Sequence, residues 1–284
     1  MLITLHWLSR RSLRFLHALG GAVGWLAYAF SASYRQCLRD NTSLAGLDAA
    51  QRRAAVAEAG RLALELPRLW LRPPGAPIAD PVRWEGEALI DSLIAAGRGF
   101  VLLTPHMGSF EVAAQAYAER FGARQPMTVL YRPARQRWLR EIEERARTRP
   151  CLNTAPANLS GVRLMLRALK RGETIGMLPD QVPPQGQGVW ASFFGRPAYT
   201  MTLAARLLQQ TGAGVAVLYV ERLARGAGYV VRVMPLAETP PEGAADEAAA
   251  LAINRSMEAV IRMKPTQYLW GYHRYKAPRG SAEP

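Results

Sequence analysis

The sequence predicts an α/β protein, in which a mixed, largely parallel sheet is flanked by helices within a single layered domain. From residue 82 onward, short apolar segments of strand length alternate with longer segments of helical period. Residues 100–104 form a continuous apolar run, which is typical of a strand buried on both faces. The composition, with 49% hydrophobic and 20% charged residues, is that of a folded chain.

The individual elements follow from hydrophobic periodicity and from the residues that end helices and form turns. Helices are expected at 49–71, 87–96, 110–121, 135–147, 161–170, 201–210 and 246–263. Strands are expected at 82–84, 100–104, 127–131, 174–178, 215–220 and 229–234. Pro67 should kink the first of these helices, and Ser160 should cap the helix at 161–170. A loop rich in Pro, Gly and Gln follows residue 181.

The N-terminal segment between Leu13 and Phe30 is largely apolar, but Arg14, His17 and three glycines interrupt it. A membrane span needs about 20 mostly apolar residues, so this segment is marginal for one. Four interpretations compete: a cleaved signal peptide, an uncleaved anchor, a helix lying in the membrane interface, and a buried core helix. The small residues Ser31-Ala32-Ser33 resemble a cleavage site.

Flanking charge and the free thiols favour retention of this segment on the cytoplasmic face of a membrane. The flanking or included basic residues are Arg10, Arg11, Arg14, Arg35 and Arg39. We therefore expect residues 1–34 to form an N-terminal membrane-associating helix and residues 35–284 to form the α/β domain.

The formal net charge of +14 predicts an anionic partner. Nucleic acid is the usual partner of so basic a chain, but no zinc-ligand spacing, RNA-binding aromatic motif or basic recognition helix occurs. The arginines are spread among apolar runs and aromatic residues, which suits an anionic membrane surface better. We therefore expect a membrane partner and no nucleic acid.

The cysteines and histidines predict neither a disulfide framework nor a metal centre. Cys37 and Cys151 are the only cysteines, and free thiols suit a reducing cytoplasm. The four histidines show no spacing that is typical of metal ligands. We expect no metal and no cofactor.

The stretch from Phe100 to Glu111 carries the chemistry that the sequence predicts. A buried strand ends, Pro105 breaks the backbone, and His106 precedes Glu111 by five residues. Ligands bind at the carboxyl ends of strands in open α/β sheets. On a regular helix, positions five apart diverge by about 140°. The two side chains can therefore meet only if His106 lies in the turn and Glu111 in the first turns of the helix.

Such a pair is suited to general-base catalysis, with the carboxylate holding Nδ1–H while Nε2 removes a proton. Spacing alone is equally compatible with a structural histidine beside a solvated acid. Ser109 is a rival nucleophile, but no Gly-x-Ser-x-Gly motif surrounds it.

Four further blocks follow the His-x4-Glu motif in order. They are Val129-Leu-Tyr131-Arg132-Pro133, Met177-Leu-Pro179-Asp180-Gln181, Phe193-Phe194-Gly195-Arg-Pro197-Ala198 and the segment from Gln267 to Lys276. With them the chain resembles the bacterial lipid A biosynthesis lauroyl/myristoyl acyltransferases, within the lysophospholipid acyltransferase superfamily. The resemblance covers residues 13–278.

This resemblance implies transfer of a fatty acyl group from acyl carrier protein to a hydroxyl of a lipid A precursor, on the cytoplasmic face of the bacterial inner membrane. It also implies that no covalent acyl-enzyme forms. By position, His106 is the base, Glu111 is its partner, and Arg132 and Asp180 line the acceptor site. Phe110 departs from the family pattern, in which many members have Trp before the acid.

The same blocks have physical interpretations of their own. Arg132 follows a strand, as His106 does, and its guanidinium suits a phosphate or carboxylate. Asp180, with Gln181 beside it, also follows a strand and either orients a polar group or caps a turn. Phe193 and Phe194 line an acyl channel or pack in the core; the sequence leaves both open.

A cluster of arginines between residues 132 and 149 predicts either a docking face for acidic acyl carrier protein or precursor phosphates, or a solvated helix face. Three other functions also remain open from the sequence. They are acylation of another glycolipid or lysophospholipid, hydrolysis of a thioester with water as acceptor, and lipid binding without catalysis.

Overall fold

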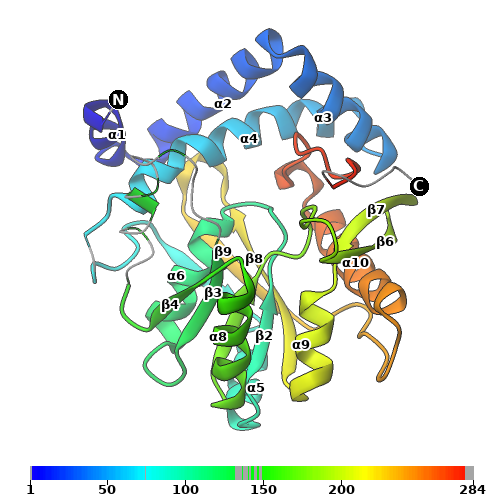
Figure 1. The fold of residues 1–284 in the computed structure, drawn as a ribbon. Coiled ribbons are helices and arrows are strands. Elements are labelled where there is room, and N and C mark those ends of the chain that lie inside the picture. Colours follow the sequence, from blue (N-terminus) through cyan, green and yellow to red (C-terminus); the bar gives the residue numbers. More distant parts are fainter. Residues whose placement is uncertain are drawn as a thin grey trace.

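A seven-stranded sheet with helices on both faces forms the body of the protein (Figure 1). The computed structural model describes residues 2–73, 75–131 and 149–278, together with 136, 140, 142, 143 and 146. The strand order is β1-β9-β8-β2-β5-β3-β4, and every neighbouring pair is parallel except β8 with β9. The α/β architecture with a mixed, largely parallel sheet is thus confirmed.

The strands of this sheet are short and largely apolar. They are β1 (Val82–Glu85), β2 (Phe100–Leu103), β3 (Met127–Tyr131), β4 (Leu152–Pro156), β5 (Thr174–Met177), β8 (Gly214–Arg222) and β9 (Tyr229–Met234). β2 lies between β8 and β5 and is buried at all four positions. Its continuous apolar run follows from this central place, since both faces are covered.

Each face of the sheet has its own hydrophobic core, and the side chains of β2 alternate between them. Phe100 and Leu102 pack in one cluster with residues of α5 (Ala88–Ala95) and α6 (Phe110–Phe121). Val101 and Leu103 pack in the other, with residues of α8 (Leu159–Lys170), α9 (Leu203–Thr211) and α10 (Asp246–Met263). This period of two is what an extended strand between two layers requires.

Four helices precede the sheet and lie across its upper end as drawn in Figure 1. They are α1 (Leu2–Ser9), α2 (Leu13–Phe30), α3 (Ala32–Leu44) and α4 (Ala49–Trp70). Among the described residues, no single helix has the length and hydropathy to cross a membrane. The pair α2 and α3, bent by 104°, meets the length and composition limits only when taken together.

α2 and α4 approach each other closely because glycines face across the contact. A Cβ on Gly60 would overlap the carbonyl oxygen of Gly20, and one on Gly24 would overlap the carbonyl oxygen of Val56. α2 is therefore packed along α4, with Leu13, Leu16 and the glycines on its buried face.

α4 includes Pro67 within its span and ends at Trp70. The cap expected at Ser160 was wrong. Asn158, rather than Ser160, caps α8, because its side-chain oxygen accepts from two backbone N–H groups at 3.0 and 3.2 Å.

Other elements were missed or lie outside the description. The segment expected as a loop contains the antiparallel hairpin β6 (Gly188–Phe193) and β7 (Arg196–Met201), so the helix expected from residue 201 begins at Leu203. β4 was also missed. The helix expected at 135–147 falls largely outside the described residues.

The glycine contact predicts that Gly60→Ala destabilises the protein by about 1–3 kcal/mol, since an added methyl group forces α2 and α4 apart. Gly21→Ala is the matched control, because its Cβ would lie at an ordinary 3.8 Å from the Cβ of Ala57. Urea unfolding should show Gly21→Ala unchanged or stabilised by up to about 1 kcal/mol. Equal unfolding free energies for the two variants would contradict the close packing.

Candidate active site

Two polar side chains that follow neighbouring strands meet near the centre of the sheet. β2 and β5 run parallel, with Leu103 opposite Met177. His106 and Asp180 each come three residues after these paired positions, and a proline directly precedes each of them. Because parallel strands end at the same edge of a sheet, equal offsets bring the two side chains together.

The carboxylate of Asp180 binds both the backbone and the ring of His106. His106 N donates to Oδ2 at 2.8 Å, and Nδ1 lies 2.7 Å from Oδ1. Asp180 is 1% exposed, whereas the His106 side chain is 17% exposed. Burial alone would raise the pKa of Asp180, but the charge and hydrogen bonds of His106 outweigh it and lower this pKa. Asp180 thus stays an anion.

The carboxylate hydrogen-bonded to Nδ1 of His106 is thus that of Asp180, whereas Glu111 was expected there from the sequence. Glu111 lies where it was expected, in the first turn of α6, and is half-buried. Its Oε2 accepts a hydrogen bond from Trp70 Nε1 at 3.0 Å. Phe110 directly precedes Glu111 in the chain. Its ring contacts the His106 ring edge-on, with the ring centroids 5.0 Å apart. The aromatic residue before the acid therefore packs against the imidazole.

The segment after α10 closes the site from another side. Leu269 N donates to the carbonyl oxygen of His106 at 3.0 Å. Tyr268 is buried beside Asp180, and its pKa is raised well above 10 by burial first and by Asp180 second. Tyr268 therefore remains a phenol. These contacts give the segment Gln267–Trp270 a structural role beside the site.

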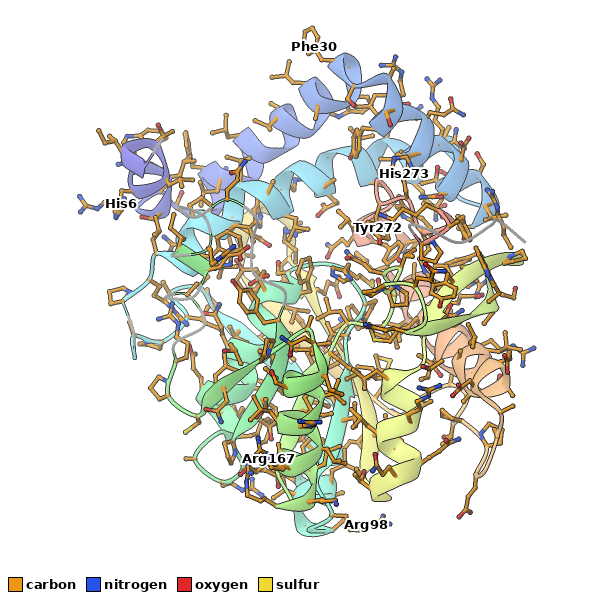
Figure 2. All side chains as sticks on the ribbon, viewed as in Figure 1. His6, Phe30, Arg98, Arg167, Tyr272 and His273 are labelled. Atoms are coloured by element: carbon orange, nitrogen blue, oxygen red, sulfur yellow. The ribbon has the colours of Figure 1, made fainter. Side chains whose placement is uncertain are left out.

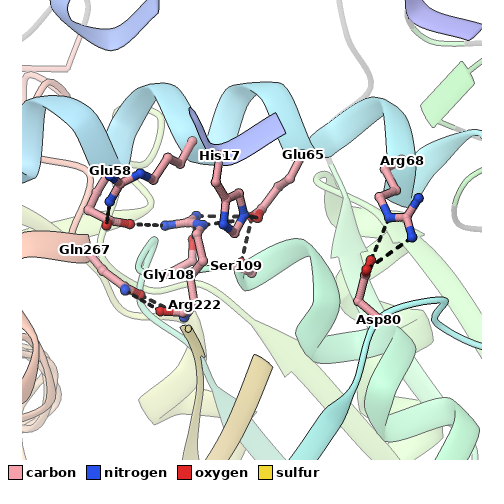
Figure 3. A network of polar contacts seen from close by, with 10 residues as sticks. His17, Glu58, Glu65, Arg68, Asp80, Gly108, Ser109, Arg222 and Gln267 are labelled. Carbon is pink, nitrogen blue, oxygen red and sulfur yellow. Dashed lines mark hydrogen bonds and ion pairs between the residues drawn. The ribbon is translucent and has the colours of Figure 1, made fainter. Parts of the chain in front are cut away.

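A buried ionic network lies behind the His106 turn (Figure 3). Its centre is Glu65 of α4, which is 0% exposed. Arg222, at the end of β8, donates to both Glu65 oxygens at 3.0 and 3.1 Å and to Glu58 at 2.6 Å. Ser109 Oγ donates to Glu65 at 2.6 Å, and His17 Nε2 of α2 lies 3.0 Å from it. Ser109 is thus a structural hydroxyl and not a free nucleophile.

This network holds the turn that carries His106. Arg222 donates to the Gly108 carbonyl oxygen at 2.9 Å, and Ser109 N donates to Val220 O at 2.9 Å. Gly108 has a φ of 57°, and a Cβ there would overlap the Val220 carbonyl oxygen, so glycine is required. Gly108 N also donates to Gln267 O at 2.9 Å. The turn is fixed from α4, β8 and the C-terminal segment together.

The remaining predicted site residues are placed as follows. Arg132 lies outside the described residues. Gln181 is half-buried, directly after Asp180. Phe193 and Phe194 are 1% and 6% exposed and belong to the hydrophobic core, with ring centroids 4.9 Å apart. Their burial favours the packing alternative over a channel lining.

A small apolar cavity of about 40 Å³ lies beside the His106 turn, between β2, β5 and α6. Thr104, Phe110, Met177 and Leu178 are among the residues that line it. Among the described residues, no three His, Cys, Asp or Glu side chains gather where they could hold a metal ion.

A histidine bound to a buried carboxylate, at the carboxyl edge of an α/β sheet and beside an apolar cavity, defines a site suited to general-base catalysis. Comparison with known protein families identifies the family of the chain. The family described as bacterial lipid A biosynthesis acyltransferase matches residues 2–277, and the chain belongs to this family.

Individual relatives agree with the family. The lipid A biosynthesis palmitoleoyltransferase of Escherichia coli (strain K12) is 29% identical over 180 residues, which are 63% of this chain and 56% of its own length. The lauroyltransferase of the same organism is 29% identical over 203 residues, 70% and 64% of the two chains. A Haemophilus influenzae lipid A biosynthesis acyltransferase is 26% identical over 187 residues, 64% and 55%. The matches span less than two thirds of each relative.

The buried network predicts how stability depends on pH. Burial alone would raise the pKa of Glu65, but Arg222, His17 and Ser109 hold it below its usual value. The stabilisation from Glu65 is therefore fully present above its unfolded pKa of about 4.3 and is lost as the pH falls through the lower folded pKa. Glu65→Gln should cost about 3–5 kcal/mol at pH 7, because Arg222 loses a buried partner.

Urea unfolding of wild type and Glu65→Gln at pH 7 and at pH 3 tests this. The difference between the two proteins should shrink at the lower pH. Glu87→Gln is the control, because Glu87 pairs with Arg120 on the surface, and its cost should be at most about 1 kcal/mol. A Glu65→Gln cost that is small at pH 7, or that grows on acidification, would refute the role of the network.

Proposed function

We propose that the protein transfers a fatty acyl group from acyl carrier protein to a hydroxyl of a lipid A precursor, a late acylation in lipopolysaccharide biosynthesis. The observation that carries the proposal is the hydrogen-bonded pair of His106 and Asp180 in a chain of this family. The pair supplies a positioned base at the edge of the sheet where ligands bind.

The reaction needs one proton acceptor and one activated carbonyl. Asp180 accepts from Nδ1–H of His106, so Nε2 has a lone pair for the acceptor hydroxyl. As Nε2 removes the proton, the hydroxyl oxygen attacks the thioester carbonyl carbon and a tetrahedral intermediate forms. Its collapse breaks the carbon–sulfur bond, and the imidazolium returns the proton to the leaving thiolate. No acyl-enzyme is formed.

Glu111 is proposed as a second carboxylate of this site. It follows His106 by five residues and lies in the first turn of α6, where the helix dipole favours its negative charge. An anion there stabilises the imidazolium that forms during transfer. Trp70 fixes the orientation of the carboxylate through its hydrogen bond.

Substrate contacts are proposed for the residues around the pair. Arg132 is proposed to bind an anionic group of the acceptor, and Gln181, next to Asp180, is proposed to donate to it. The apolar cavity beside Phe110 offers an entry for the acyl chain, since its lining is largely hydrocarbon. Phe193 and Phe194 are proposed to pack in the core rather than to contact the acyl chain.

We also propose that residues 1–34 attach the protein to the cytoplasmic face of the inner membrane. Large apolar side chains of α1 and α2 are exposed, and Figure 2 places Phe30 at the outer end of α2. They are Ile3, Trp7, Phe15, Leu19, Trp25, Leu26 and Phe30. Neighbouring arginines supply attraction to anionic lipid, as in an interfacial helix. Acyl carrier protein, which is acidic, is proposed to dock on the arginine-rich segment 132–149.

His106→Ala is expected to lower the rate of acyl transfer by about 10² to 10⁴, because the positioned base is lost. Asp180→Asn should lower it over the same range, since an amide cannot enforce the Nδ1–H tautomer as a carboxylate does. The assay is mass spectrometry of the lipid product formed by purified protein from an acyl carrier protein thioester and a lipid A precursor. Glu173→Gln, in an exposed pair with Arg171, serves as control.

Each contrary outcome has a distinct meaning. Wild-type rates from His106→Ala would exclude His106 as the base. Loss in Glu111→Gln with full activity in Asp180→Asn would assign the Nδ1 partner to Glu111 instead. Release of free fatty acid that is independent of any acceptor would indicate a hydrolase, and product only with other glycolipids or lysophospholipids would change the acceptor.

Membrane attachment predicts that the double variant Trp25→Ser with Phe30→Ser binds anionic vesicles at least about tenfold more weakly. Burial of one large apolar side chain is worth roughly 1.5–3 kcal/mol, and 1.4 kcal/mol is tenfold. Leu159→Ser is the control, because Leu159 is 66% exposed but lies on α8. Vesicle sedimentation that finds equal losses in both proteins would contradict the proposed surface.

A further inference from the structure

A polar cavity of about 210 Å³ lies between α3 and the C-terminal segment, apart from the His106 pair. Its lining includes Asp40, Asn41, Arg196, His273, Arg274 and Lys276. Figure 2 shows Tyr272 and His273 of the C-terminal segment close under α3. The block from Tyr272 to Lys276, which the proposed reaction does not use, thus forms one wall of a cavity.

The cavity has an excess of positive charge. Its three constant cations are Arg196, Arg274 and Lys276, and its one carboxylate is Asp40, which accepts a hydrogen bond from Gln36 at 2.8 Å. The guanidinium of Arg196 lies over the Tyr275 ring at 5.0 Å, and the Lys276 ammonium over the Tyr272 ring at 4.9 Å. Within the described part of the chain, neither cation has a carboxylate partner.

Arg274 is the buried member of this group, with 2% of its surface exposed. Its two terminal nitrogens donate to neutral oxygens, the Tyr199 carbonyl and the Thr200 hydroxyl, both at 2.8 Å. Its Nε has no hydrogen-bond partner. A buried guanidinium bonded only to neutral groups is costly, because charge is desolvated without a directly bonded counter-ion. Arg274 therefore brings to the cavity wall a positive charge that is not hydrogen-bonded to any carboxylate of the described residues.

We propose that this cavity binds a phosphate monoester carried by a lipid headgroup. Arginine, lysine and imidazole groups donate hydrogen bonds to phosphate oxygens. A phosphate would also place negative charge beside the three cations of the cavity. A lipid is favoured over a free ion because α3 continues directly from Phe30, the exposed end of the proposed membrane surface.

The cavity is within reach of the His106 site. Leu269 N donates to the carbonyl oxygen of His106, and Arg274 is the fifth residue after Leu269. Five residues span at most about 18 Å. A glycolipid headgroup can therefore present a hydroxyl at His106 while its phosphate occupies the cavity. This assignment to the acceptor rests on the proposed function, whereas the binding of a lipid phosphate does not.

The binding test uses calorimetric titration of purified protein with short-chain phosphatidic acid below its micelle concentration. Arg196→Ala with Lys276→Ala removes two exposed cations and should weaken binding at least about tenfold, since a charge-assisted hydrogen bond is worth about 1.5–3 kcal/mol. Arg98→Ala with Arg167→Ala is the matched control, because it removes the same charge from the far end of the molecule (Figure 2). This control should bind as wild type does.

Three results would overturn the proposal. Equal weakening in both double variants would mean attraction to net charge alone. Equal binding of short-chain phosphatidylglycerol, a diester, would exclude selection of a monoester. Binding of inorganic phosphate as tight as that of the lipid would make the ligand a free ion.

Measurements of acyl transfer distinguish a failure of this anion site from a failure of the proposed function. Arg196→Ala with Lys276→Ala should raise KM about tenfold for a phosphorylated acceptor and not for the same acceptor after phosphatase treatment. Equal effects on both acceptors would exclude the acceptor as the lipid. If wild type acylates neither acceptor, the proposed function fails, and the calorimetric result still decides the anion site.

Discussion

The carboxylate of Asp180 is the interaction on which the site depends, because it binds the backbone and the imidazole of one residue at once. The bond to the ring sets the orientation of the imidazole, and the bond to the backbone N–H ties the residue that carries it to the end of β5. With both bonds made, the direction of Nε2 is set by the sheet, since β2 and β5 are locked in parallel register immediately below. The low pKa of Asp180 keeps the acceptor charged.

The Glu65 network extends this constraint to the helices that precede the sheet. Glu65 and His17 belong to α4 and α2, while Arg222 ends β8 and donates to the turn itself. α2 carries the exposed apolar side chains of the proposed membrane surface and packs on α4 through glycines. Attachment of α2 to a membrane would therefore place the mouth of the site at a fixed orientation to lipid. One ionic cluster would thus link the proposed membrane contact to the orientation of His106.

Much of the fold was predictable from the sequence, and the site only in part. β2 and the position of His106 followed from one apolar run and a proline. Asp180 was assigned to the site, but not to the imidazole, because sequence shows spacing along the chain and not which strands are neighbours. The offset that β2 and β5 share was visible only once their pairing was known.

Glu65 and Arg222 are 157 residues apart and occupy unremarkable helix and strand positions, so no local pattern marks them. The β6–β7 hairpin was hidden by the glycine- and proline-rich segment that leads into it.

The central claim is that Asp180 fixes the His106 ring with Nδ1 protonated and Nε2 available as a base. Nitrogen-15 NMR of histidine-labelled protein at about pH 9, where an ordinary imidazole is neutral, tests it directly. The His106 signals, identified by their loss in His106→Ala, should show a protonated Nδ1 and an unprotonated Nε2, and Asp180→Asn should abolish this preference. A proton on Nε2 in the wild-type protein, or a tautomer that is indifferent to Asp180→Asn, would contradict the account.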